Sequence, residues 1–351
     1  MCIRDRDWEK CCEGFSLVDR ALREDNAYPG MDARSRAWYR RRGECLAAKL
    51  GVAETVVARQ AVALGKARQE QGGRTAQAGY YLLEEGQRDL YAILRPDKRC
   101  RLQREERKLW RFWIVQGTLL AGLLYLCGAT AWYQGLLALL PAWSLAAGLS
   151  VRLFLARSQP SMLPRMEYKD ALPPEQATLV VVPALITDAE SLRGVIRQLE
   201  VHMLATRMEH CYYGVLGDFP DGKQAQRPGE GELLRLAKSL VEELNQKYPS
   251  PTPLFYYLHR RRTYQKADGL YMGWERKRGA LCQLVTLLTQ GDASPFALLT
   301  HPLPQGIRYC LTLDADTVLP PGALAKLVGA MAHPLHAPEW DDQGVVKKGY
   351  G

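Results

Sequence analysis

The last 200 residues of this sequence predict an α/β fold with a parallel sheet, preceded by a membrane-spanning helical hairpin and a small helical N-terminal domain. Three observations support this organisation. After residue 157, short apolar segments alternate with amphipathic helical segments. Residues 112–151 carry no charged side chain, although charged residues make up 24% of the chain. In the first 100 residues, apolar side chains recur at helical spacing. Strands separated by helices favour parallel pairing with right-handed crossovers.

The composition changes at two places, which divide the chain into three regions. We predict a helical accessory domain at 1–100, a basic juxtamembrane segment with two transmembrane helices at 101–157, and an α/β domain at 158–351. Residues 1–7 match nothing else in the sequence, and we interpret them as a non-native leader.

In the N-terminal region, apolar periodicity predicts helices at 15–23, 37–50 and 54–67. Asp32 is expected to cap one helix and Gly51 to end another. A turn is expected at 28–32, and the apolar segment 79–83 has no clear periodicity. Nothing in this region has the spacing of metal ligands or of a nucleophile, which favours an accessory role.

The uncharged block is too long for a single span, which needs about 20 residues. It divides at the turn-forming residues 132–135, so we predict helices at about 113–131 and 136–155. Basic residues flank the block whereas the connecting loop has none, and the positive-inside rule then places both flanks in the cytoplasm. The alternative is a buried helical hairpin within a soluble core.

The net charge of +9 is unevenly distributed. Much of the excess lies in residues 95–111, directly before the apolar block, so membrane lipids with anionic head groups are a simpler partner than nucleic acid. No nucleic-acid partner is predicted. The nine cysteines are irregularly spaced without a Cys-x-x-Cys pair, which favours a reducing compartment over a disulfide framework or a zinc knuckle.

The α/β region contains four predicted strand–helix pairs. The strands are expected at 178–183, 213–217, 254–258 and 307–313, and the helices at 188–207, 231–247, 276–288 and 320–331, the last with prolines in its first turn. Ligands bind at the carboxyl ends of the strands in such sheets. Asp218 and Asp314 directly follow strands and are therefore candidate site residues.

The run Leu-Asp-Ala-Asp-Thr at 313–317 is the most informative motif. Two carboxylates, Asp314 and Asp316, leave a buried strand one residue apart. Oxygen ligands suit Mg²⁺ or Mn²⁺, which can neutralise a diphosphate leaving group. The alternative is a solvated acidic turn.

The run Trp-Glu-Arg-Lys-Arg-Gly at 274–279 places several cations at a helix start, where they oppose the helix dipole. A bound phosphate would explain Lys277 and Arg278 there, and a solvated basic turn is the alternative. We interpret the basic run 259–262 as a surface charge run, and a second anion contact is the alternative.

Asp218 could contact the base or ribose of a nucleotide, or form an Asx turn. The six histidines show no ligand pattern, and His333 and His336 are predicted to be structural. The sequence contains neither a P-loop nor a Gly-x-Ser-x-Gly elbow, which disfavours P-loop NTPases and α/β-hydrolases.

Together these motifs resemble the cyclic β-1,2-glucan synthases, family 84 of the glycosyltransferases. The runs at 274–279, 311–317 and 333–335 carry the resemblance, with further support from 182–187, 79–83 and 28–39. The resemblance covers almost the whole chain after the leader. The segments 277–281 and 314–316 also resemble the broader processive family 2 synthases.

This resemblance implies a GT-A-like (Rossmann-like) nucleotide-sugar domain and a multi-pass location in a bacterial cytoplasmic membrane. It implies UDP-glucose as donor, Mg²⁺ (or Mn²⁺) as cofactor and a growing β-1,2-glucan chain as acceptor, with inversion and therefore a base. By analogy, Asp314 and Asp316 would hold the metal, and Lys277 and Arg278 the phosphates. The nucleotide would be contacted at its nucleoside by Asp218, and also by Thr187.

The chain departs from the family in two ways. Gly217 stands where members often have threonine. The sequence also stops within the transferase domain, so we expect a fragment that holds the donor-site half, is inactive alone, and has its base downstream of Gly351. The alternatives are a family 2-type synthase of another linkage and a non-catalytic membrane-anchored adaptor.

Overall fold

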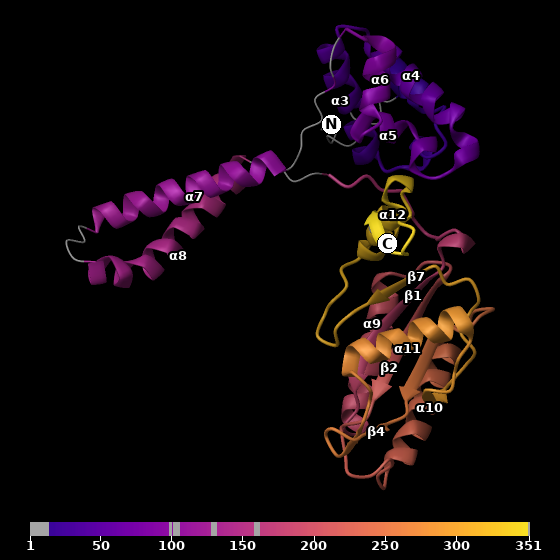
Figure 1. Cartoon of the computed structure of the whole chain (residues 1–351). Coiled ribbons are helices and arrows are strands. Elements are labelled where there is room, and N and C mark those ends of the chain that lie inside the picture. The colour runs from indigo at the N-terminus through magenta and orange to yellow at the C-terminus, as the bar shows by residue number, and fades with distance from the viewer. Residues whose placement is uncertain (1–13, 98–99, 101–105, 128–131, 158–161, 350–351) are drawn as a thin grey trace, which may run out of the picture. The chain divides into compact units, whose positions relative to one another are not determined.

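The computed structural model describes residues 14–97, 100, 106–127, 132–157 and 162–349, which fall into two compact units, Met1–Pro164 and Arg165–Gly351. Figure 1 shows helices throughout the first unit and a mixed α/β arrangement in the second. The predicted leader at 1–7 lies outside the described residues.

The N-terminal part of the first unit is a group of short helices around buried aromatic and aliphatic side chains. The helices are α2 (Leu17–Leu22), α3 (Ala33–Leu50), α4 (Glu54–Ala67), α5 (Ala78–Leu83) and α6 (Gln87–Leu94), with 3₁₀ turns at Tyr28–Gly30, Gln69–Gln71 and Arg74–Ala76. The fully buried tyrosines are Tyr28, Tyr39 and Tyr81. Their large apolar area supplies much of the driving force for this small core.

The predicted helix boundaries are largely confirmed. The Asp32 carboxylate accepts a 2.8 Å hydrogen bond from the Ser35 amide, so α3 begins at Ala33, four residues before the predicted start. Gly51 ends this helix with a φ of 72°, a left-handed conformation that glycine adopts without strain. The segment 79–83, whose structure was not predicted, lies in α5.

The uncharged block forms two helices, α7 (Glu106–Leu126) and α8 (Trp132–Arg157), which lie side by side in Figure 1. The rings of Phe112 and Phe154 meet edge to face, with centroids 5.8 Å apart. Both helices begin earlier than predicted, and residues 128–131 lie outside the described part. Among the described residues, one helix is long and apolar enough to cross a membrane, at Tyr133–Ala156, with a mean hydropathy of 1.6.

The second unit contains a five-stranded sheet in the order β6-β3-β2-β1-β7. The strands are β1 (Thr178–Leu185), β2 (Cys211–Asp218), β3 (Phe255–Arg260), β6 (Phe296–Leu299) and β7 (Tyr309–Thr312). The four predicted strands are confirmed, and they pair in parallel. The sequence prediction missed β6, which pairs antiparallel to β3 at the edge of the sheet.

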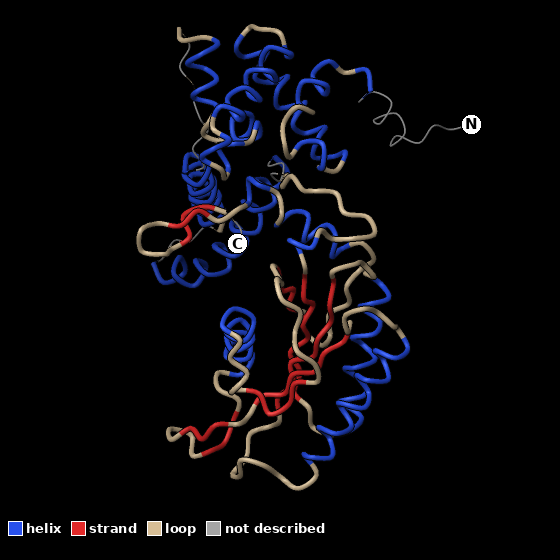
Figure 2. Tube along the Cα trace, turned by 90° about the vertical axis from the view of Figure 1, so that its right-hand side faces the viewer, coloured by secondary structure: helices blue, strands red, loops and turns tan. Residues whose placement is uncertain are grey.

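Helices cover both faces of this sheet, as Figure 2 shows for the strands in red and the helices in blue. They are α9 (Ala189–Ala205), α10 (Glu230–Lys247), α11 (Arg276–Gln290) and α12 (Ala323–Met331). Alternate residues of β1 enter opposite cores: Val180 and Val182 pack with α9, α10 and α12, whereas Leu179 and Val181 pack with α11. This alternation is what a strand buried on both faces requires.

Two small antiparallel hairpins and one helix start were not predicted correctly. The hairpins pair β4 (Thr263–Gln265) with β5 (Leu270–Met272), and β8 (Glu339–Trp340) with β9 (Val346–Lys348). Helix α12 begins at Ala323 rather than at the prolines. Gly322, with a φ of 71°, turns the chain immediately before this helix, so the prolines at 320 and 321 precede it.

Candidate active site

The carboxyl ends of the parallel strands form one edge of the sheet, and the strand order reverses there between β1 and β7. The chain runs outward from β1 through β2 to β3 and later returns to place β7 on the other side of β1. Ligands of open α/β sheets bind at such a reversal. Thr187 follows β1 and Asp314 follows β7, so both predicted residues flank the expected position.

The basic and acidic motifs meet at this edge. Lys277, in the first turn of α11, donates a short hydrogen bond to a carboxylate oxygen of Asp314. The two side chains remain 49% and 63% exposed. An ion pair so open to water contributes little to stability. Both groups are therefore accessible to a charged ligand at little cost to the fold.

The turn that carries Lys277 has an unusual backbone. Glu275 and Arg276 have φ values of 47° and 49°, the left-handed region that non-glycine residues seldom occupy. Each such residue costs on the order of 1–3 kcal/mol and persists only where surrounding contacts fix it. A Cβ at Gly279 would lie 1.9 Å from the Trp274 carbonyl oxygen, so glycine is required where the turn folds back on the helix.

The remaining cations of this turn make side-chain pairs. Arg276 donates a short bond to Asp221 in the loop after β2. Arg278 lies 3.5 Å from the Glu275 carboxylate and is 81% exposed. The predicted phosphate contact of Arg278 thus concerns a solvent-facing side chain, whereas Lys277 lies against the acidic motif.

Asp218 ends β2 and faces a buried arginine. Arg260, at the end of β3, donates from Nε to Asp218 Oδ1 at 2.7 Å and makes a short second bond to Oδ2. The Arg260 side chain is only 1% exposed. Charge-assisted bidentate pairs of this kind fix geometry strongly. The carboxylate of Asp218 is therefore held in a defined orientation at the carboxyl end of β2.

The interpretation of residues 259–262 as a surface charge run is wrong. Besides Arg260, the side chain of Arg262 is also buried, at 2% exposure, and pairs with Glu230 of α10. His259 is buried against the ring of Phe219, and burial with the two neighbouring arginines lowers the pKa of this histidine to about 3. Arg260 and Arg262 can be buried because carboxylates 42 and 32 residues away in the sequence pair with them. No local sequence pattern indicates such distant partners.

A pocket of about 340 Å³ opens beyond the ends of β1 and β2. Thr187, Phe219 and Arg227 are among its lining residues. The Thr187 hydroxyl donates to Asp188 Oδ2 at 2.8 Å, and the backbone amides of Glu190 and Ser191 donate to Oδ1. The Ser191 amide and the Thr187 hydroxyl hold the pKa of Asp188 below its usual value. This corner places the apolar side chain of Phe219 beside polar groups, a combination common in small-molecule pockets.

The structure thus connects three of the six predicted site residues at one edge of the sheet. Asp314 touches Lys277, and Asp218 is joined through Arg260 to the turn that carries Lys277. Thr187 lines the pocket, and Asp316 is exposed beyond β7. Reasoning from the sequence missed Phe219 and Arg227 as lining residues, although Phe219 directly follows Asp218.

A divalent cation such as Mg²⁺ needs several oxygen ligands. Among the described residues, no group of three or more His, Cys, Asp or Glu side chains is arranged to hold a metal ion. Asp314 and Asp316 would supply two oxygen ligands. Mg²⁺ commonly binds to one or two carboxylates and completes its shell with water and substrate phosphates. The acidic pair therefore fits a metal held jointly with a phosphorylated ligand.

His333 and His336, which the sequence predicted to be structural, are buried in local hydrogen bonds. His333 Nδ1 accepts from the Leu335 amide at 3.2 Å, and His336 Nδ1 bonds the Ala330 carbonyl oxygen. Burial lowers the pKa of His333 to about 3. These contacts fix the chain after α12 and confirm the structural prediction.

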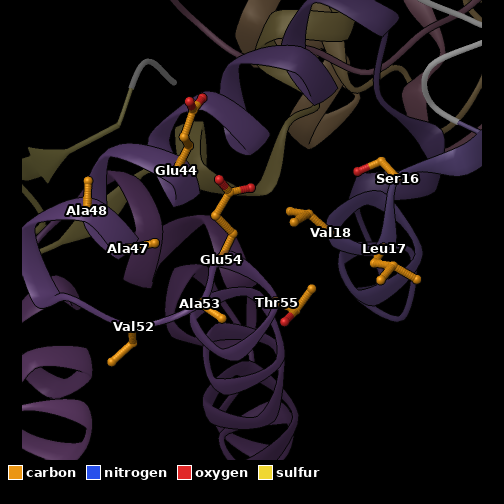
Figure 3. A pocket seen from close by; sticks show the side chains of 10 residues that line it. All are labelled: Ser16, Leu17, Val18, Glu44, Ala47, Ala48, Val52, Ala53, Glu54 and Thr55. Atoms are coloured by element: carbon orange, nitrogen blue, oxygen red, sulfur yellow. The ribbon is translucent and has the colours of Figure 1, made fainter.

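The N-terminal helices contain a second, wider hollow of about 640 Å³. Figure 3 shows Leu17 and Val18 of α2 on one side, and the carboxylates of Glu44 and Glu54 from α3 and α4 on the other. Small side chains such as Ala48 form much of its wall. The lining contains two carboxylates and no histidine, lysine or arginine, so it does not suit an anion.

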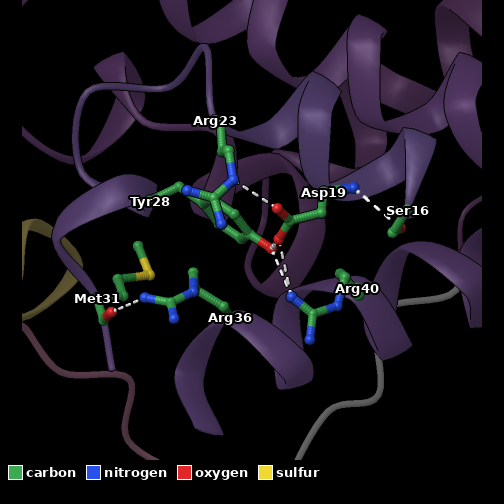
Figure 4. Close-up of polar contacts among 7 residues, drawn as sticks. All are labelled: Ser16, Asp19, Arg23, Tyr28, Met31, Arg36 and Arg40. Carbon is green, nitrogen blue, oxygen red and sulfur yellow. Dashed lines mark hydrogen bonds and ion pairs between the residues drawn. The ribbon is translucent and has the colours of Figure 1, made fainter. Parts of the chain in front are cut away.

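A buried ionic network, shown in Figure 4, lies in the same group of helices. The Asp19 carboxylate is 1% exposed and accepts from the Tyr28 hydroxyl at 2.7 Å, Arg40 Nη1 at 2.9 Å and Arg23 Nε at 2.6 Å. Burial and the bond to Asp19 raise the pKa of Tyr28. This network joins α2, the following turn and α3, which is a structural role.

Comparison with known proteins supports the resemblance seen in the motifs. The cyclic beta-(1,2)-glucan synthase NdvB of Rhizobium meliloti (strain 1021) is 34% identical over 359 residues, a match that covers 96% of this chain. The chain spans 13% of the length of that relative. No family model matches the sequence. The predicted resemblance to cyclic β-1,2-glucan synthases is thereby confirmed.

Proposed function

We propose that this chain carries the donor-binding part of a membrane-bound glucosyltransferase that builds β-1,2-glucan from UDP-glucose. The observation that carries the proposal is the contact between Lys277 and Asp314 at the reversal of strand order. It unites a cation and an acidic pair, the two groups that a nucleoside diphosphate with its metal requires. The similarity to NdvB supports glucan synthesis as the activity.

In this proposal the nucleoside enters the pocket beside Thr187 and Phe219. Phe219 supplies an apolar wall of this pocket, and Asp218, the last residue of β2, directly precedes it. The diphosphate lies toward Lys277, whose ammonium group is a compact point charge suited to phosphate. Arg278, exposed on the next position of the turn, is a second phosphate contact.

Asp314 and Asp316 would hold Mg²⁺ or Mn²⁺, which when bound supplies charge neutralisation for the UDP leaving group. Lys277 would then release the carboxylate of Asp314. Displacement of the exposed ion pair costs little, and it leaves the ammonium group for a phosphate oxygen. Transfer with inversion also needs a base to deprotonate the acceptor hydroxyl.

We also propose that α7 and α8 form a transmembrane hairpin in the cytoplasmic membrane, with both flanks on the cytoplasmic side. The large apolar side chains of α8 support this, because Leu137 and Leu140 are more than 70% exposed and several others, including Leu145, are more than 50% exposed. Such side chains are stable in lipid and costly in water. The basic residues before α7 would contact anionic lipid head groups.

The test is binding of UDP-glucose by the 351-residue chain in detergent, measured with Mg²⁺ and with chelator. We expect chelation and Asp316→Ala to weaken binding by about tenfold or more, because each would remove or weaken the bound cation that attracts the phosphates. The matched control is Asp342→Ala, at an exposed carboxylate in the β8–β9 turn. If neither chelator nor Asp316→Ala changes the affinity for UDP-glucose, the metal assignment is overturned.

The runner-up is a family 2-type polysaccharide synthase of another sugar or linkage, favoured by the shared motifs at 277–281 and 314–316. Competition among UDP-sugars distinguishes the two: preference for UDP-glucose supports the glucan synthase, and equal or better binding of another UDP-sugar supports the alternative. A chain that binds none of them would fit a membrane-anchored adaptor.

A further inference from the structure

Arg260 occupies a position that the proposed donor site does not itself explain. It ends β3, and its guanidinium lies between the end of β2 and the turn that begins α11. The side chain is 1% exposed, so it is closed to solvent and to a ligand. A buried arginine is costly unless every donor is paired.

All five N–H groups of Arg260 have an acceptor. Two bond the Asp218 carboxylate. Two others bond the backbone carbonyl oxygens of Trp274 and Arg276, each at 3.0 Å. The fifth bonds Gln283 Oε1 of α11 at 3.2 Å. A guanidinium offers five donors in a rigid planar fork, and here each of them is used.

These bonds hold the strained turn on both sides of its left-handed residues. The two carbonyls belong to positions 274 and 276, and Glu275 with its φ of 47° lies between them. Lys277 is the next residue, and it reaches Asp314 from this turn. Backbone strain of this kind needs surrounding contacts to maintain it, and Arg260 supplies two of them.

Gly273 shows how closely the chain approaches the guanidinium. A Cβ at this position would lie 2.6 Å from Arg260 Nη2 and 3.1 Å from Asp218 Oδ2. The turn therefore rests directly on the Arg260–Asp218 pair, with no room for a side chain between them.

We propose that Arg260 is a positioning residue for the donor-phosphate site, which acts by fixing the turn from which Lys277 projects. The inference rests on the proposed function, since it assumes that Lys277 binds the donor phosphates. Asp218 is also a positioning residue in this proposal, because its carboxylate orients the guanidinium of Arg260. Lysine in place of Arg260 keeps the charge but offers three donors instead of five, so it cannot hold both carbonyls and the carboxylate in this geometry.

The test is a double-mutant cycle on UDP affinity, measured with the full chain in detergent. The variants are Arg260→Lys, Lys277→Ala and both together. In the wild-type background, Lys277→Ala is expected to weaken UDP binding about tenfold, the effect of losing one charge-assisted bond. In the Arg260→Lys background the same change is expected to weaken it less than about threefold, because the ammonium group is already displaced.

The control is Arg261→Lys, whose wild-type side chain donates to the Phe296 carbonyl oxygen at the edge of the sheet, outside the proposed site. In that background, Lys277→Ala should keep its full effect. Gly273→Ala is a second variant, which displaces the guanidinium sterically, leaves all charges in place, and should reduce the effect of Lys277→Ala as Arg260→Lys does.

The outcomes separate the two hypotheses. If the wild-type chain binds no UDP, the proposed function fails. If it binds UDP, and Lys277→Ala weakens binding by the same factor with Arg260→Lys, with Gly273→Ala and in the wild type, Arg260 has only a structural role and the inference is overturned. The inference is supported if Lys277→Ala has a smaller effect on UDP binding in the Arg260→Lys or the Gly273→Ala background and keeps its full effect in the Arg261→Lys background.

Discussion

At the scale of single residues, buried ionic groups organise both units of this protein. Asp19 in the helical unit and Arg260 in the α/β unit are almost completely buried, and each is surrounded by partners from several segments. Such groups add little net stability compared with apolar side chains, but removal of one partner leaves an uncompensated charge. Their effect is to fix one arrangement of the segments that they join.

Asp19→Ala is therefore expected to destabilise the helical unit by about 3 kcal/mol, the cost of breaking a buried charge network. Hydrogen exchange of the α2 and α3 amides in the full chain measures this loss. The control is Glu24→Ala, which breaks the exposed pair with Lys66 and should leave exchange nearly unchanged. Similar effects for the two variants would show that the Asp19 network does not stabilise the unit.

At the scale of elements, the four parallel strands and the long helices could be predicted from the sequence, whereas the edge strand β6 and the small hairpins could not. Periodicity located β1, β2, α9 and α10 because each is buried along a continuous apolar run or stripe. It missed β6, a short strand whose pairing with β3 depends on a partner in the folded sheet. The local sequence pattern indicates which segments are buried, but not which edge of the sheet remains open to pair with another strand.

The residues of the candidate site could likewise be predicted only in part. The predicted Asp314 and Lys277 do meet, because strand and helix order alone bring the exits of β7 and the start of α11 to one edge. The buried roles of Arg260 and Arg262 could not be predicted, because a basic run is normally solvated and its burial here depends on the carboxylates of Asp218 and Glu230.

For α8, a charge on the exposed face distinguishes a lipid-facing helix from a soluble one. Leu145 is 54% exposed, and Leu145→Arg should cost about 3 kcal/mol in membrane insertion. We expect a smaller fraction of the chain to remain in the membrane pellet after alkaline extraction, whereas Leu145→Ala should be retained as the wild type is. Equal retention of Leu145→Arg and Leu145→Ala would contradict the transmembrane assignment.

At the scale of the whole molecule, the chain combines a helical unit, a pair of apolar helices and an α/β unit whose stability depends on pH. His259 and His333 both have a pKa lowered to about 3 from 6.5, chiefly by burial. The folded state thus keeps them neutral while the unfolded state takes up protons below pH 6.5. Their contribution is fully present above that pH and is lost progressively as the pH falls toward 3.

For His259 alone, the loss between pH 7 and pH 5 is expected to be about 2 kcal/mol, from the 1.36 kcal/mol that each pH unit contributes. Hydrogen exchange of the β2 and β3 amides at the two pH values, corrected for intrinsic rates, measures it. His259→Gln, which cannot titrate, should lose about 2 kcal/mol less than the wild type over this range. An identical pH dependence in wild type and His259→Gln would contradict the burial of a neutral imidazole.

The central claim is that the basic turn of α11 and the acidic pair after β7 form one binding site for a nucleoside diphosphate. The most direct measurement compares the affinities of UDP and uridine for the wild-type chain and for Lys277→Ala, in the presence of Mg²⁺. The account predicts that the wild type binds UDP at least about tenfold more tightly than uridine, and that Lys277→Ala removes most of this difference. Equal affinities of the wild type for UDP and uridine would contradict it.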